Sequence, residues 1–243
     1  MEPTFLLILL AIFAVAFLYS SVGHAGASGY IAVLALAGFA PGVIKPTALV
    51  LNILVASIGA YQFWRAGYFQ WKLFWPFAVA AAPMAYLGGY LDLPAQIFKI
   101  VVGAVLLLSA ARFIFRQGDP VTVTPPALPV ALGTGAGLGL LSGLTGTGGG
   151  IFLTPLLLFC RWARTKNVAA TSALFILVNS STGLLGFLSS GKSIPSFTWA
   201  FAVFAVVGGT LGSWLGSRKF PVRTIQLLLA AVLLVAGMKL IWN

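Results

Sequence analysis

The stretch that decides the fold reads Gly-Leu-Thr-Gly-Thr-Gly-Gly-Gly at residues 143–150, and it separates two apolar runs at 127–142 and 150–160. A helix as short as 150–160 rises only about 16 Å, whereas the hydrocarbon core of a bilayer is about 30 Å thick. Glycine accepts backbone conformations that other residues avoid, so it suits a turn at such a depth. We therefore expect a broken element, re-entrant or hairpin-like, that turns at these glycines inside a membrane.

The same arrangement occurs near the start of the chain, where 23–29 reads Gly-His-Ala-Gly-Ala-Ser-Gly between apolar runs at 4–22 and 27–40. The glycines at 23, 26 and 29 recur 120 residues later at 143, 146 and 149, and the pattern of 57–88 recurs 124 residues later. The chain is therefore a duplication. We expect two homologous halves at 1–118 and 127–243, joined by a Pro- and Gly-containing linker at 119–126.

Composition places the chain in a membrane. Hydrophobic residues make up 60% of the 243 positions, charged residues only 7%, and the mean hydropathy is +1.05. Soluble domains carry about 25% charged residues, and a β-barrel would show alternating rather than continuous apolar segments. The fold class is thus an all-α polytopic membrane protein, with the first apolar run retained as a helix.

Each half is expected to continue with three transmembrane helices, at 46–65, 73–91 and 95–115, then at 168–190, 197–215 and 222–242. If each opening returns to its starting side, the 14 basic residues divide 10 against 4 across the membrane; if each crosses once, they divide 8 against 6. The positive-inside rule favours the first arrangement. It makes the halves inverted repeats with both termini outside the cytoplasm, and the alternative is eight single-crossing helices in parallel repeats.

Several chemistries are not expected. The single cysteine, Cys160, allows no intramolecular disulfide and no CxxC motif, and one histidine with three acidic residues makes a metal site or catalytic set improbable. We expect no enzyme activity and no cofactor. The basic residues sit singly or in small clusters at predicted helix ends, so nucleic acid is not an expected partner.

In transporters built from inverted repeats, the substrate binds near the midplane where broken helices meet. Backbone N–H groups and hydroxyls at the two breaks, together with uncharged side chains on the helix that follows each break, would suit a dehydrated anion. The candidate substrate-binding residues are Gly23, His24, Gly26, Ser28, Gly29, Asn52, Thr145, Gly146, Thr147, Gly148, Gly149, Thr171, Ser172 and Asn179.

Structural explanations remain open for each of these residues. Glycines also let helices pack closely, and polar side chains in membranes often form interhelical hydrogen bonds. His24, the only histidine, could donate to an oxyanion, carry a proton, or bond to the backbone at the break. Lys45 could attract an anion at the mouth of a pathway or snorkel to the interface.

At these residues the sequence resembles the TauE/SafE sulfite exporter family, also called the toluene-sulfonate uptake permease family. The resemblance rests on 146–155 (Gly-Thr-Gly-Gly-Gly-Ile-Phe-Leu-Thr-Pro) followed by 169–174 (Ala-Ala-Thr-Ser-Ala-Leu), with a looser copy beginning at 26–30. It covers essentially the whole chain. The resemblance implies multi-pass insertion in a bacterial inner membrane and transport of sulfite or related organosulfur anions.

The leading hypothesis is secondary transport, in the export direction, of a small sulfur-containing anion such as sulfite or a sulfonate. The alternatives are a channel or a transporter for another small anion, an intramembrane lipid-modifying enzyme, and a structural membrane subunit. The expected partners are the anionic substrate and the lipid bilayer. The sequence leaves the oligomeric state open, with a homodimer as a candidate.

Overall fold

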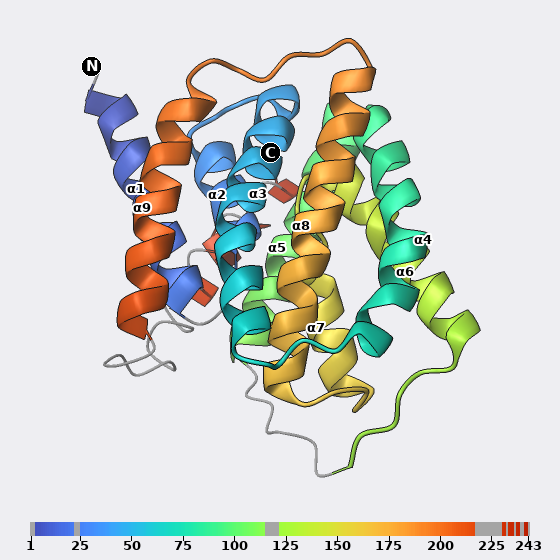
Figure 1. Ribbon diagram of the computed structural model, residues 1–243. Coiled ribbons are helices and arrows are strands. Elements are labelled where there is room, and N and C mark those ends of the chain that lie inside the picture. Colours follow the sequence, from blue (N-terminus) through green and yellow to red (C-terminus); the bar gives the residue numbers. More distant parts are fainter. Residues whose placement is uncertain are drawn as a thin grey trace.

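The computed structural model describes residues 3–21, 25–114, 122–216, and nine positions between 230 and 242, and all regular structure in these residues is helical (Figure 1). This confirms the all-α class. The continuous helices are α1 (Pro3–Ser21), α2 (Ala27–Leu36), α3 (Pro41–Arg65), α4 (Trp71–Tyr90), α5 (Ala95–Ile114), α6 (Leu128–Thr145), α7 (Gly150–Phe159), α8 (Thr165–Ser189) and α9 (Thr198–Gly216).

Two helices are longer than the sequence predicts. The prediction started the third helix at Pro46, but α3 begins at Pro41 and takes Pro46 into its second turn. At this position proline removes the helical hydrogen bond to the carbonyl oxygen of Gly42, so Pro46 interrupts the bonding of α3 without ending the helix. The prediction also ended the first apolar run of the second half at residue 142, whereas α6 continues to Thr145.

Three of the described helices are long and apolar enough to cross a membrane, judged by length and composition: α3, α6 and the part of α8 from Lys166 to Ser189. Shorter apolar helices include α2 and α7, with 10 residues each. The second half therefore opens with one helix of spanning length, α6, and one that is too short to span, α7.

The bundle has two ends, which we name after the residues that mark them. At the Asp92 end, the Asp92 carboxylate forms an ion pair with Lys192. At the Tyr68 end, the Tyr68 carbonyl oxygen accepts a hydrogen bond from Asn167 Nδ2 at 2.8 Å. α3 runs from the Asp92 end to the Tyr68 end and α8 runs the opposite way, so these two central helices are antiparallel (Figure 1).

Each half opens with a pair of helices that turns back. The start of α1 and the segment after α2 both lie against the start of α9 at the Asp92 end, because Phe5 stacks on Phe201 and Phe39 contacts Phe197, each with ring centroids 5.5 Å apart. α6 starts at the Tyr68 end and α7 returns there. The two hairpins thus open from opposite ends of the bundle.

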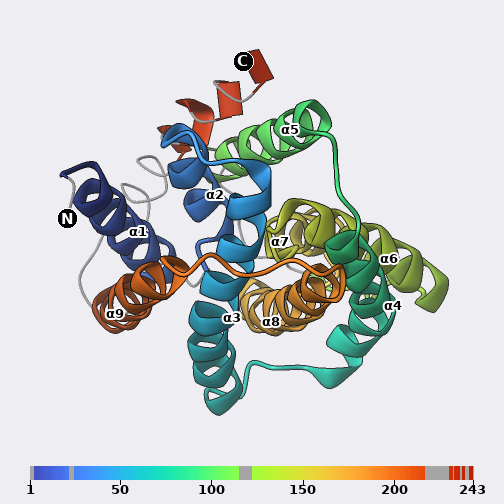
Figure 2. The same ribbon diagram turned by 90° about the horizontal axis from the view of Figure 1, so that it is seen from above.

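One helix from each half packs mainly against helices of the other half. α4, from the first half, packs against α6 and α8, whereas α9, from the second half, packs against α1 and α3 (Figure 2). Glycines permit the closest of these contacts. A Cβ on Gly139 of α6 would collide with the Ala81 carbonyl oxygen of α4, and a Cβ on Gly212 of α9 would collide with the Phe17 carbonyl oxygen of α1.

The apolar core accordingly forms two clusters on either side of the α3–α8 contact. The larger cluster joins α1, α2, α3, α5 and α9, and includes the fully buried Tyr30 and Phe201. The smaller joins α4, α6, α7 and α8 around Phe77 and Phe175. The turn between α6 and α7 lies beside α3 and α8, where the two clusters meet.

Candidate functional site

The turn between α6 and α7 requires glycine at three positions. Gly146, which caps α6, has φ +78°, and Gly148 and Gly149 have φ values of +71° and +77°. Residues with a Cβ are strained in this left-handed region. The glycine-rich sequence therefore turns the chain here, as predicted, and the N-terminus of α7 follows directly with no side-chain cap.

Three helices enclose this turn with polar side chains. Asn52 of α3 donates from Nδ2 to the Gly146 carbonyl oxygen at 3.2 Å. A Cβ on Gly148 would lie 2.8 Å from Ser180 Oγ of α8. A Cβ on Gly149 would lie 3.2 Å from Asn179 Nδ2 of α8 and 3.3 Å from the Ser142 Cβ of α6. We call Asn52, Ser142, Asn179, Ser180 and the turn 145–149 the α6–α7 cluster.

The side chains of this cluster are fully buried, and several of their polar atoms have no hydrogen-bond partner among the described residues. These atoms are Asn52 Oδ1, Ser142 Oγ, Ser180 Oγ and both the Nδ2 and Oδ1 of Asn179. A buried polar group without a partner costs about 1 to 3 kcal/mol. Native folds rarely collect such groups at one point unless something else satisfies them.

The start of α7 presents hydrogen-bond donors to the turn. Two carbonyl groups in the last turns of α6 are occupied, because the Leu141 oxygen accepts from Thr145 Oγ1 at 2.6 Å and the Ser142 oxygen accepts from the Gly146 N–H at 2.8 Å. The first N–H groups of α7 have no partner within their helix and carry partial positive charge. The hydroxyls and the Asn179 amide add further donors.

The structure brings together only some of the predicted site residues. Asn52, Asn179 and the run from Thr145 to Gly149 meet in the cluster, where Thr145 Oγ1 and Thr147 Oγ1 are 3.0 Å apart. Thr171 and Ser172 lie about two turns before Asn179 on α8, and Ser172 Oγ is bonded to Thr154 Oγ1 at 2.8 Å. Thr171 Oγ1 is buried without a hydrogen-bond partner among the described residues.

Two cluster members, Ser142 and Ser180, were absent from the predicted set. Ser180 belongs to the polar run 179–182 of α8, and Ser142 is the last residue before the glycine stretch. A helical periodicity argument could have paired Ser142 with Thr145 on one face of α6.

The first hairpin is built differently. Gly26 has φ +91° and lies under the ring of Tyr30, Ser28 Oγ is bonded to Tyr19 Oη at 2.7 Å, and a Cβ on Gly29 would lie 2.5 Å from Val15. Of these three predicted site residues, Gly26 forms a turn, Ser28 makes an intramolecular hydrogen bond and Gly29 allows close packing. Gly23 and His24 lie outside the described residues.

The predicted repeat aligns the polar residues of the α6–α7 cluster with apolar residues of the first half. The shifts of 120 and 124 residues pair the positions of Ser142, Thr145, Thr147, Asn179 and Ser180 with apolar residues in the first half. These partners are Val22, Ala25, Ala27, Val55 and Ala56. Asn52, whose counterpart in the second half is Ile176, is a polar residue of the first half that contacts the second hairpin.

Lys45 has a structural role that neither sequence interpretation anticipated. Its side chain is only 5% exposed, and Nζ donates to the carbonyl oxygens of Gly88, Gly89 and Leu91 at 2.8 to 2.9 Å. A cation that binds the free carbonyls at a helix C-terminus is favourably placed in the helix dipole. Lys45 thus caps the C-terminus of α4.

Comparison with known proteins agrees with this architecture. The family described as "Sulfite exporter TauE/SafE" matches residues 8–240. The chain is 43% identical over 240 residues to a probable membrane transporter protein, y4hK, of Sinorhizobium fredii, with 96% of each chain covered. It is 28% identical over 258 residues to the probable membrane transporter protein YjnA of Bacillus subtilis, with 97% of this chain and 98% of the relative covered. No solved structure gives a significant match. Because the family match spans nearly the whole chain and includes both glycine breaks, the chain belongs to the TauE/SafE family of membrane transporters.

Proposed function

We propose that this transporter exports a small sulfur-containing anion, such as sulfite or a sulfonate, and that the anion binds at the α6–α7 cluster. The observation that carries the proposal is the group of buried, unpartnered amide and hydroxyl groups around a glycine turn at the start of α7. The family description supplies the chemical class of the substrate.

The chemistry of the cluster suits transport. Its side chains are all uncharged, so an anion would be held by hydrogen bonds alone and could leave again without breaking an ion pair. Because these side chains are fully buried, access requires the surrounding helices to separate. Alternating access of this kind is typical of transporters with discontinuous helices.

We further propose that the two halves are inverted repeats in a bacterial inner membrane. The antiparallel course of α3 and α8, and hairpins that open from opposite ends, support this arrangement. Basic side chains at the Tyr68 end orient that end toward the cytoplasm under the positive-inside rule. They are Arg65, Lys72, Arg161, Arg164 and Lys166.

Flux through proteoliposomes tests the proposal. Purified protein is reconstituted, and the efflux of sulfite, sulfate, thiosulfate and ethanesulfonate is followed against protein-free vesicles. We expect saturable efflux of sulfite or the sulfonate, with a higher KM in Ser180→Ala. Ser109→Ala is the matched control, since Ser109 is equally buried but donates to its own helix at the Val105 carbonyl oxygen.

Two outcomes would contradict the proposal. Saturable efflux of an unrelated anion alone would show that the cluster takes another substrate. Equal kinetics of wild type, Ser180→Ala and Ser109→Ala would place the binding site elsewhere in the chain.

A further inference from the structure

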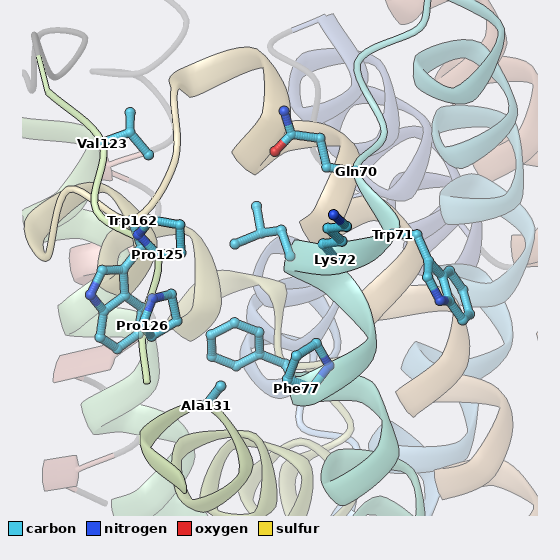
Figure 3. A pocket seen from close by; sticks show the side chains of 11 residues that line it. Gln70, Trp71, Lys72, Phe77, Val123, Pro125, Pro126, Ala131 and Trp162 are labelled. Atoms are coloured by element: carbon cyan, nitrogen blue, oxygen red, sulfur yellow. The ribbon is translucent and has the colours of Figure 1, made fainter. Parts of the chain in front are cut away.

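A pocket of about 490 Å³ opens at the Tyr68 end, away from the α6–α7 cluster (Figure 3). It lies between the first turns of α4, the start of α6, the linker before α6 and the loop between α7 and α8. Its volume falls in the range typical of small-molecule sites. The lining residues come from these four segments: Gln70, Trp71, Lys72, Leu73, Pro76, Phe77, Val123, Pro125, Pro126, Ala131 and Trp162.

The walls of the pocket are apolar. The rings of Phe77 and Trp162 are tilted by 36° with centroids 6.0 Å apart, and Pro126 lies beside Trp162 in Figure 3. The linker that carries Pro126 is held in place by a hydrogen bond from the Thr124 N–H to the Arg161 carbonyl oxygen at 3.0 Å. Such a surface accommodates hydrocarbon, and it offers few groups that could hold a small hydrated ion.

The rim of the pocket is positively charged. Lys72 lies there, exposed, and forms no hydrogen bond or ion pair with any described residue. It is the second residue of α4, whose N-cap residue Gln70 makes no side-chain capping bond. The N–H groups at the start of α4 therefore add partial positive charge beside the Lys72 ammonium.

No carboxylate among the described residues balances this charge. Asp92 is the single acidic residue in the described ranges, and it is paired with Lys192 at the opposite end. Basic pockets between transmembrane helices are suited to anionic lipid head groups, and Trp side chains are common at that depth. A ligand for this pocket needs an apolar body and a negative head.

We propose that this pocket binds an anionic phospholipid from the surrounding bilayer. The phosphate accepts hydrogen bonds from the Lys72 ammonium and the first N–H groups of α4, while the adjoining acyl carbons pack against Phe77 and Trp162. This inference does not depend on the identity of the transported anion. It makes the Tyr68 end a lipid-specific site in addition to a generally basic surface.

Lipid titrations monitored by native mass spectrometry test the proposal. Phosphatidylglycerol and phosphatidylcholine with identical acyl chains are compared on detergent-purified wild type and three variants. Lys72→Gln removes the rim charge, and Val123→Trp fills the pocket from the exposed linker. Arg65→Gln is the matched control, because it removes one charge from the same end outside the pocket.

We expect wild type and Arg65→Gln to prefer phosphatidylglycerol, Lys72→Gln to bind it about fivefold more weakly, and Val123→Trp to lose the preference. Size-exclusion profiles and Tm values verify that each variant is folded. The proposal is wrong if Lys72→Gln and Arg65→Gln weaken binding equally, which would indicate diffuse attraction, or if neither variant has an effect. It is also wrong if glycerol 3-phosphate or ethanesulfonate displaces the lipid at similar concentrations, since the pocket would then be a site for small anions.

Discussion

Replacing Asn179 with leucine should change stability and ligand affinity in opposite directions. Leucine has the same number and branching of side-chain heavy atoms as asparagine, so the change removes polarity while nearly keeping the shape. In the free protein, both Nδ2 and Oδ1 of Asn179 are fully buried and have no partner among the described residues. The wild-type fold therefore bears the cost of keeping this amide away from water.

The magnitudes follow from that environment. Removing unsatisfied groups from a buried site should stabilise the free protein by about 1 to 3 kcal/mol, which corresponds to about 2 to 4 °C in Tm per kcal/mol for a chain of this size. Losing one donor to a charged ligand should weaken anion binding by about 1.5 to 3 kcal/mol, or about tenfold to a hundredfold in Kd. Stability sacrificed for function is a recognised feature of binding sites.

Two measurements on the same preparation check this prediction. The Tm is measured in detergent without anion, and Kd is measured by calorimetric titration with sulfite or a sulfonate. Ser109→Ala is the control, because its hydroxyl donates to the Val105 carbonyl oxygen and should affect Kd little. A lower Tm in Asn179→Leu would mean that the amide stabilises the fold, and a higher Tm with unchanged Kd would mean that it does not contact the ligand. Either result would refute the reasoning.

Further predictions concern packing, capping and topology. Gly139→Ala should destabilise the protein by about 1 to 3 kcal/mol, because the new Cβ would collide with the backbone of α4. Gly137→Ala in the same helix should instead stabilise the protein by up to about 1 kcal/mol, because its Cβ would meet nothing within 4 Å. Comparing the Tm values of the two variants checks this pair of predictions. Lys45→Met should lower Tm by several degrees, since two α4 carbonyl oxygens and that of the C-cap residue Leu91 lose their donor, and an unchanged Tm would argue against the cap. Single cysteines at Thr122 and Gly191, in a background without the native cysteine, should react with an impermeant maleimide from opposite faces of oriented vesicles; labelling from one face would contradict the proposed topology.

The sequence by itself determined the features that depend on short-range properties of the chain. Hydropathy alone establishes helices in a membrane, because no other backbone arrangement compatible with continuous apolar runs satisfies its hydrogen bonds in lipid. The turn at Gly146, Gly148 and Gly149 was predictable for a similar reason, since a left-handed φ depends on the residue itself and its immediate neighbours. The repeat is a property of the sequence and needs no structure to be seen.

Only the tertiary structure separates polar side chains that have a partner in the fold from polar side chains that have none among the described residues. Ser28 and Asn179 look alike in sequence, as polar residues near or after a glycine break, yet Ser28 is bonded to Tyr19 while Asn179 has no partner among the described residues. Asn52 reaches a turn 94 residues away, and Lys45 reaches carbonyl groups more than 40 residues away. Such contacts depend on how helices far apart in the sequence pack together, and hydrogen-bond partners that distant leave no periodic signal in the sequence.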